Sequence, residues 1–263
     1  MSEERWRSLG FREDATTFQS QSQNARVWTE NWVKDSLFCP SCGSSSLDKY
    51  PNNRPVADFI CKECDENYEL KSQKTNFGRR VNDGAYRTMT ERLAARDNPN
   101  LILMNYDRDA LAVTNLIVVP KHFFVPEIIE PRKPLAATAR RAGWQGCNIL
   151  IGDVPEAGKI WIVRNGIVSS REEIVESWQR TLFLRDGSIA ARGWLIEVMK
   201  CVERIGLPEF SLEDVYAFET TLRQVYPSNF NIRPKIRQQL QVLRDQGYLH
   251  FLGSGRYRLA QVQ

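Results

Sequence analysis

Asp58, Glu69 and Lys71 are the residues of this chain whose types and spacing best suit chemistry on a phosphodiester. In an extended strand, residues two apart share a face, so Glu69 and Lys71 point one way and Leu70 the other. Two carboxylates, with the Leu70 backbone carbonyl as a further ligand, can hold Mg²⁺, which prefers oxygen ligands. Lys71 would orient an attacking water or stabilise a pentavalent phosphorus. The alternative is a solvated charged face, and Glu30 on a preceding helix is a weaker candidate for the same metal.

Two CxxC pairs stand beside these residues, at 39–42 and 61–64, with residues 43–60 between them. This spacing is typical of a structural zinc site, because each pair presents two thiolates to one tetrahedral ion and leaves no position open for water. The predicted ligands are Cys39, Cys42, Cys61 and Cys64. Redox-active thiols are the alternative, whereas Cys147 and Cys201 are predicted to be small buried residues.

The second CxxC pair also positions the predicted catalytic residues. Segments 55–61 and 67–71 have the composition of short strands, and residues 61–64 would form the turn between them. Such a hairpin places Asp58 on one strand next to Glu69 on its neighbour.

The rest of the first 187 residues is typical of a mixed α/β domain. We expect helices over residues 24–35 and 84–96, buried strands over 101–107 and 111–120, and a hairpin over 158–168 with Asn165-Gly166 as its turn. The segment around Gly187-Ser188 marks a boundary, so we predict domains at residues 1–187 and 188–263.

The second domain has the pattern of a winged helix-turn-helix. Helices are expected over residues 193–206, 211–227 and 232–247, followed by a hairpin over 248–259. In the third helix, Ile236, Leu240 and Leu243 predict a buried stripe that leaves a basic face outside.

Composition limits the function without naming it. A chain of 263 residues with 42% hydrophobic and 26% charged residues is expected to fold as a globular protein. No signal peptide or membrane-length apolar run is visible, which predicts a cytoplasmic protein. The net charge of +4 is compatible with a polyanionic partner, and only two histidines argue against histidine-rich hydrolases and HNH nucleases.

Several segments together resemble the DpnI-type methyl-directed restriction endonucleases, from about Asn24 to Leu259. They are NNRPVADFIC, YELKS, NDGAYRTM, RKPL with TARRAGWQGCNI, and IRQQLQVLRD. The resemblance implies a PD-(D/E)xK nuclease core with a mixed sheet and an inserted four-cysteine zinc hairpin, plus a C-terminal winged-helix domain. Asp58, Glu69 and Lys71 match its catalytic positions, and its proline is displaced to Pro55. The implied activity is Mg²⁺-dependent cleavage of both strands of DNA at GATC sites containing N6-methyladenine.

The resemblance also implies which residues read double-stranded DNA. An aromatic face can enclose the methyl group, and Trp144 matches that role, with Thr138, Arg140 and Arg141 before it. The alternative for Trp144 is an ordinary core tryptophan, and the alternative for the two arginines is a solvated basic loop. The candidate readers on the third helix and the wing are Arg233, Lys235, Arg237, Gln238, Gln239, Ser254, Arg256 and Tyr257.

Two other functions remain open from the sequence. A non-catalytic regulator built from a zinc ribbon and a winged helix would bind DNA without cutting it. The segment between the zinc hairpin and the winged helix is larger than such a regulator needs. A nuclease of the same fold with a different DNA target is the second alternative.

Overall fold

A computed structural model describes residues 6, 8–11, 20–51, 57–93, 95 and 97–260. Pro55, the displaced proline, lies outside the described residues. By their internal contacts the described residues form two compact units. Unit 1 comprises the described residues of Met1–Gly78, Ala94–Lys121 and Ala157–Gln179. Unit 2 comprises those of Arg79–Leu93, His122–Glu156 and Arg180–Gln263.

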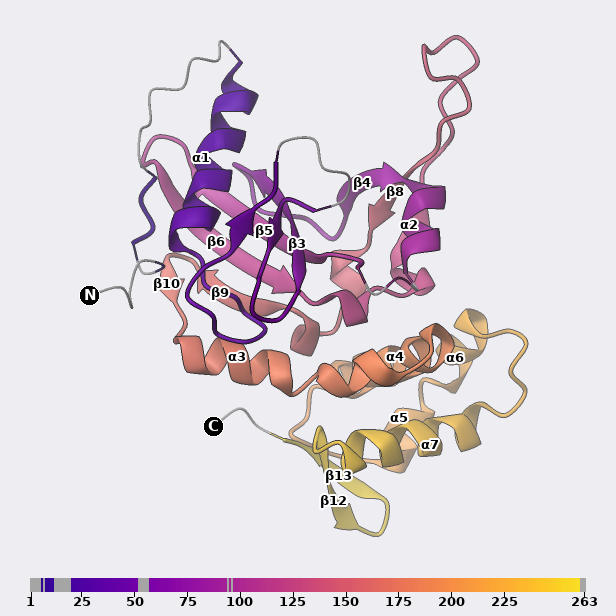
Figure 1. Cartoon of the computed structure of the whole chain (residues 1–263). Coiled ribbons are helices and arrows are strands. Elements are labelled where there is room, and N and C mark those ends of the chain that lie inside the picture. Colours follow the sequence, from indigo (N-terminus) through magenta and orange to yellow (C-terminus); the bar gives the residue numbers. More distant parts are fainter. Residues whose placement is uncertain are drawn as a thin grey trace. The chain divides into compact units, whose positions relative to one another are not determined.

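Unit 1 is built on a seven-stranded sheet of order β1-β2-β3-β5-β6-β9-β10 (Figure 1). Its strands are β1 (Asp48–Lys49), β2 (Phe59–Ile60), β3 (Asn67–Gln73), β5 (Asn100–Asp107), β6 (Ala112–Val119), β9 (Ile160–Arg164) and β10 (Ile167–Val168). Strands β3 and β5 pair in parallel, and the other neighbours pair antiparallel. The sheet is therefore mixed.

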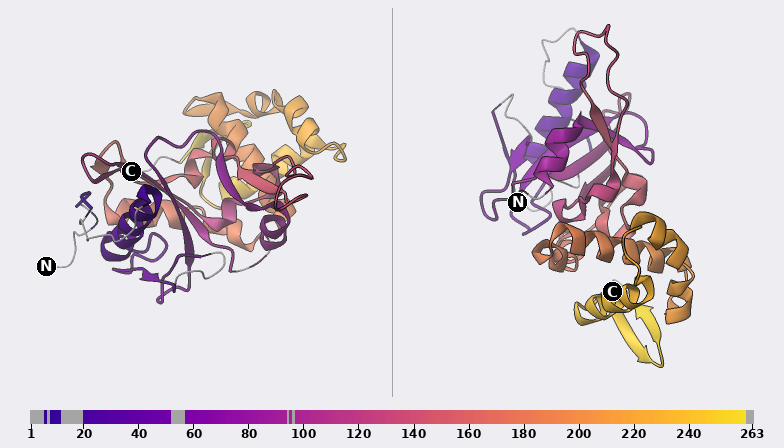
Figure 2. Two further views of the ribbon diagram at one scale, coloured as in Figure 1. Left: turned by 90° about the horizontal axis from the view of Figure 1, so that it is seen from above. Right: turned by 90° about the vertical axis from the view of Figure 1, so that its right-hand side faces the viewer.

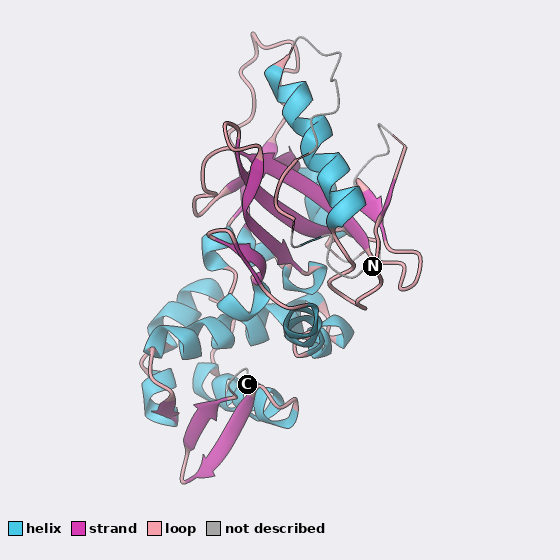
Figure 3. Cartoon of the chain, turned by 90° about the vertical axis from the view of Figure 1, so that its left-hand side faces the viewer, coloured by secondary structure: helices cyan, strands magenta, loops and turns pink. Residues whose placement is uncertain are grey.

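The centre of this sheet is buried on both faces, as the two apolar runs predicted. Residues 100–106 of β5 are all buried, which requires cover on each side of the strand. Helix α1 (Gln21–Ser36) packs on β1 and β3, and α3 (Arg171–Gln179) packs on β9 (Figures 1 and 3). The predicted turn between β9 and β10 is present, with Asn165 and Gly166 both at positive φ.

Unit 2 contains a second sheet of order β4-β8-β7, formed by β4 (Val81–Ala85), β8 (Gly146–Ile149) and β7 (Ile129–Pro131). Helix α2 (Tyr86–Arg92) follows β4 and is shorter than the helix predicted over 84–96. The first residues of that segment are held in the β4–β8 ladder, where Ala85 pairs with Gly146. Short 3-10 turns lie at Lys121–Phe123, Pro126–Ile128, Ile151–Asp153, Glu156–Gly158 and Leu182–Asp186.

The remainder of unit 2 is the C-terminal helix-turn-helix. Its elements are α4 (Ile189–Ile205), β11 (Glu209–Ser211), α5 (Leu212–Tyr216), α6 (Glu219–Val225), α7 (Ile232–Asp245), β12 (Leu249–Gly253) and β13 (Arg256–Leu259). The predicted buried stripe of α7 is confirmed, since Ile236, Leu240 and Leu243 are fully buried. Strands β12 and β13 form a hairpin that projects from these helices (Figure 2).

One predicted helix of this domain is interrupted. Residues 211–227 form α5 and α6 rather than one helix, and a turn at Ala217 and Phe218 separates them. Ser211 caps α5 as predicted, in a reciprocal capping box with Asp214. The predicted boundary at 187/188 coincides with the N-cap of α4, where the Ser188 side chain accepts from the Ala191 N–H. Among the described residues, we find no helix with both the length and the apolar character needed to cross a bilayer.

Candidate active site

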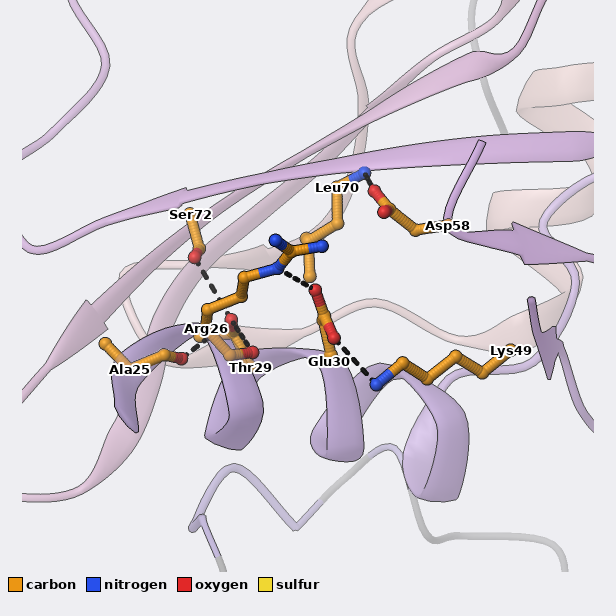
Figure 4. Close-up of polar contacts among 8 residues, drawn as sticks. All are labelled: Ala25, Arg26, Thr29, Glu30, Lys49, Asp58, Leu70 and Ser72. Carbon is orange, nitrogen blue, oxygen red and sulfur yellow. Dashed lines mark hydrogen bonds and ion pairs between the residues drawn. The ribbon is translucent and has the colours of Figure 1, made fainter. Parts of the chain in front are cut away.

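The β2–β3 hairpin brings Asp58 beside Glu69. The Asp58 N–H donates to the Tyr68 carbonyl at 2.9 Å, and Phe59 pairs with Tyr68 across the two strands. The Asp58 carboxylate reaches further along β3, where its Oδ2 accepts from the Leu70 N–H at 2.8 Å (Figure 4). The turn formed by the second CxxC pair thus fixes one carboxylate against the strand that carries the other.

Glu69 and Lys71 share one face of β3, as strand alternation predicted. The Lys71 Nζ lies 2.9 Å from the Glu69 Oε1, and both side chains are partly exposed. Ser72 points to the opposite face, where its hydroxyl lies 3.1 Å from that of Thr29 on α1. The carboxylate and the ammonium are therefore paired with each other and remain open to solvent.

A cavity of about 410 Å³ adjoins these residues. Its lining includes Arg26 and Glu30 from α1, Asp58 from the loop before β2, and Glu69, Leu70 and Ser72 from β3. Because three of these residues are carboxylates, the donor chemistry suits a hard divalent cation. The volume leaves room for a phosphate group beside it.

Glu30 is the residue of this cavity that sequence reasoning undervalued. It is 5% exposed, although a glutamate on a helix is ordinarily solvated. Its Oε2 lies 2.7 Å from the Lys49 Nζ of β1, and its Oε1 accepts from the Nε of Arg26 (Figure 4). The available signal was its position one residue after the buried Thr29 and three before the buried Val33.

The surroundings of Asp58 disfavour the ionised form of its carboxyl group. Burial is the main cause that raises the pKa of Asp58 above its ordinary value, and the negative charge of Glu30 adds to the rise. The Leu70 N–H, Arg26 and Lys71 oppose that rise without cancelling it. A half-buried carboxylate whose ionised form is disfavoured gains from a bound cation. The site therefore fits a divalent metal.

The four cysteines converge as predicted. The Sγ atoms of Cys39, Cys42, Cys61 and Cys64 all lie within 4.8 Å of one another. The Cys39 to Cys64 and Cys42 to Cys61 distances are 3.6 and 3.7 Å. Zn–S bonds of about 2.3 Å in a tetrahedron require sulfur atoms roughly 3.8 Å apart, so the cluster is able to bind zinc.

Tyr68 connects the cysteine cluster to the candidate active site. Its hydroxyl lies 3.1 Å from the Cys39 Sγ, and its ring is fully buried near Trp178 of α3. Since Tyr68 directly precedes Glu69 on β3, the packing that holds the tyrosine also fixes the backbone position of the glutamate in the strand. Cys147 and Cys201 are not members of the cluster and are buried, as predicted.

The basic loop between β7 and β8 presents Trp144 at the surface. The loop reaches well beyond its three-stranded sheet (Figure 1), and Thr138, Arg140 and Arg141 on it are exposed. Trp144 is half-buried: the Arg141 guanidinium lies 4.6 Å from its ring centroid, and a Cβ added at Gly146 would lie 2.9 Å from the indole. It is therefore not an ordinary core tryptophan.

Most of the predicted helix-turn-helix readers are on the surface of unit 2. On α7, Arg233 pairs with Glu219 and Arg237 donates to the Tyr216 hydroxyl. The Lys235 ammonium donates to Gln238 on the next turn. In the wing, Ser254 occupies the turn at positive φ, and Arg256 pairs with Glu209.

Two of the predicted readers are buried rather than exposed. Gln239 is 4% exposed because it lies on the inner face of α7, beside Leu240. Tyr257 is 8% exposed and its ring contacts Phe210 and Phe251, so it belongs to the small core beneath the wing. Both side chains therefore belong to the packing of this domain, and neither has the exposure expected of a reader.

Comparison with protein families agrees with this architecture. The model of the DpnI, Dam-replacing family matches residues 9–187, and that of the Dam-replacing helix-turn-helix domain matches residues 190–259. The helix-turn-helix domain indicates DNA as the partner. Since the first match alone covers more than half of the sequence, the chain belongs to the DpnI, or Dam-replacing, family of restriction enzymes.

Proposed function

We propose that the protein is a methylation-dependent type II restriction endonuclease that cuts both strands of DNA at GATC sites containing N6-methyladenine, with Mg²⁺ as its cofactor. The observation that carries the proposal is the juxtaposition of Asp58 and Glu69 on one hairpin, with Lys71 paired to Glu69, in a chain of this family. The cysteine cluster would hold a structural zinc.

Asp58, Glu69 and the Leu70 carbonyl would hold the magnesium ion. In an extended strand the N–H and C=O of one residue point to the same edge, so the Leu70 carbonyl faces the side on which Asp58 accepts its N–H. When bound, Mg²⁺ offsets charge on the phosphate and lowers the pKa of an attacking water. Lys71 would hold that water or the phosphate from the face it shares with Glu69.

Recognition of the methyl group is assigned to the β7–β8 loop. Trp144 offers an aromatic surface beside exposed arginines, which suits an added methyl group in the major groove. Arg140 and Arg141 would contact phosphates or guanine edges. The predicted readers of α7 and the wing that are at least partly exposed would form a second contact with DNA: Arg233, Lys235, Arg237, Gln238, Ser254 and Arg256.

The test is a digest of one GATC-containing plasmid, prepared with and without adenine methylation, with Mg²⁺ or EDTA. Fragments that appear only with methylated plasmid and Mg²⁺ are the expected result. Cleavage of both plasmids would remove the methyl specificity and keep the nuclease. Binding without cleavage of either plasmid would replace the nuclease with the non-catalytic regulator. Asp58→Ala, which should bind DNA without cutting, is the control for a contaminating nuclease.

A further inference from the structure

Arg26 is a cationic residue of the candidate active site to which the proposed function assigns no role. It stands on α1, four residues before Glu30, and it lines the same cavity as Asp58 and Glu69. Arginine offers a planar fork of donors that matches the oxygens of a phosphate.

Within the described part of the chain, the Arg26 guanidinium is held through its Nε edge only. Its Nε donates to the Glu30 Oε1 (Figure 4), and no hydrogen-bond partner for its two terminal amino groups is found among the described residues. In Figure 4 these groups lie on the side of β3 and Asp58. The Arg26 side chain is 62% exposed while the Glu30 side chain is 7% exposed, so a buried anchor orients a donor that is open to solvent.

Glu30 is in turn fixed from its other oxygen. Lys49 on β1 lies 2.7 Å from Oε2, so each carboxylate oxygen already has a cationic partner. With both oxygens engaged, Glu30 is better suited to holding Arg26 than to binding a metal. The cavity and its immediate partners also balance three carboxylates with three cations, and an incoming phosphate and Mg²⁺ would therefore meet no large excess of either charge.

We propose that Arg26 binds a phosphate of the DNA backbone at the cleavage site, and that Glu30 and Lys49 are positioning residues for it. This inference rests on the proposed nuclease function. The guanidinium stabilises charge on the phosphate from the α1 side of the cavity, whereas Lys71, which does not line this cavity, keeps its separate role beside Glu69. Removing one preorganised donor of this kind slows the chemical step by on the order of 10²–10³-fold.

The experiment is single-turnover cleavage by the full chain, with Arg26→Ala and Arg26→Gln beside wild type. Arg87→Ala is the matched control, because Arg87 donates through Nε to Glu91 at the same helical spacing but lines no part of this cavity. We expect both Arg26 variants to cut about 10²–10³-fold more slowly, at unchanged melting temperature and unchanged Mg²⁺ half-saturation, and Arg87→Ala to match wild type.

A second measurement separates phosphate binding from a structural role. Duplexes that carry one neutral methylphosphonate at each backbone position in turn are cut by wild type and by Arg26→Gln. One position is expected to slow wild type strongly and to slow Arg26→Gln little further, because the contact is already lost. Glu30→Gln should give a smaller loss at the same position.

Three results overturn the inference while the nuclease stands: cleavage by Arg26→Gln at the wild-type rate, equal slowing of both proteins at every methylphosphonate position, or a large rise in Mg²⁺ half-saturation in Glu30→Gln. The last would make Glu30 a metal ligand instead. Failure of wild type to cut, or cutting by Asp58→Ala at the wild-type rate, would overturn the proposed function itself, and this inference with it.

Discussion

Asp58→Asn should make the protein more stable in the absence of divalent metal while ending cleavage. The substitution keeps the shape of the side chain and an oxygen that can accept from the Leu70 N–H. It removes a carboxylate whose pKa is raised chiefly by burial, and whose ionised form therefore opposes folding at neutral pH. In the proposed nuclease, this carboxylate would lower the stability of the fold at the position where cleavage requires it.

The size of the effect follows from the partial burial of Asp58. A buried polar group without a partner costs about 1–3 kcal/mol, and because Asp58 is only half-buried and accepts from the Leu70 N–H, we expect the low end of that range, about 1 kcal/mol. For a protein of this size, about 1 kcal/mol corresponds to a melting temperature roughly 2–4 °C higher in EDTA. With Mg²⁺ at about 100 times its dissociation constant, wild type should gain about 2.7 kcal/mol and become the more stable protein.

The pH dependence independently tests whether Asp58→Asn stabilises or destabilises the protein in EDTA. A carboxyl whose pKa is higher in the folded state binds protons more tightly there, so its contribution to the free energy of unfolding falls as pH rises through that range. The advantage of Asp58→Asn in EDTA should be complete at neutral pH and disappear below the ordinary value of 3.8.

Differential scanning calorimetry in EDTA and in Mg²⁺, at neutral and acidic pH, measures all three effects. Asp48→Asn is the matched control, since it makes the same chemical change at an exposed aspartate that lies outside the cavity. The reasoning is refuted if Asp58→Asn is less stable than wild type in EDTA, or if Mg²⁺ stabilises both proteins equally.

Three further perturbations test other parts of the molecule. Cys61→Ser should release zinc, whose binding can contribute on the order of 10 kcal/mol to folding, and should make residues 39–64 sensitive to proteolysis. Cys201→Ala changes a cysteine outside the cluster and should retain the metal, so equal metal content in both variants would contradict the zinc assignment. Trp144→Ala should cost about 0.8 kcal/mol of preference for methylated DNA, roughly fourfold in relative affinity, whereas Trp161→Ala, which removes another arginine-stacked tryptophan, should not. Arg237→Ala should weaken DNA binding on all sequences and reduce the salt dependence by about one counterion, and an unchanged slope would remove α7 from the phosphate contacts.

Local patterns in the sequence predicted the features that depend on short-range geometry. The CxxC spacing predicted a four-cysteine cluster because each pair is a self-contained knuckle. Strand alternation placed Glu69 and Lys71 on one face, and Asn165-Gly166 predicted a tight turn, since both follow from backbone dihedrals alone.

Tertiary packing decided which side chains are buried and which remain available. Glu30 looked like a solvated helix residue until Lys49, from a strand distant in sequence, supplied its partner. Gln239 and Tyr257 looked like surface readers, but the inner face of α7 and the aromatic core under the wing bury them. Periodicity specifies which residues share a face, whereas the element that covers that face comes from elsewhere in the chain, and its charge and shape decide the role of each side chain.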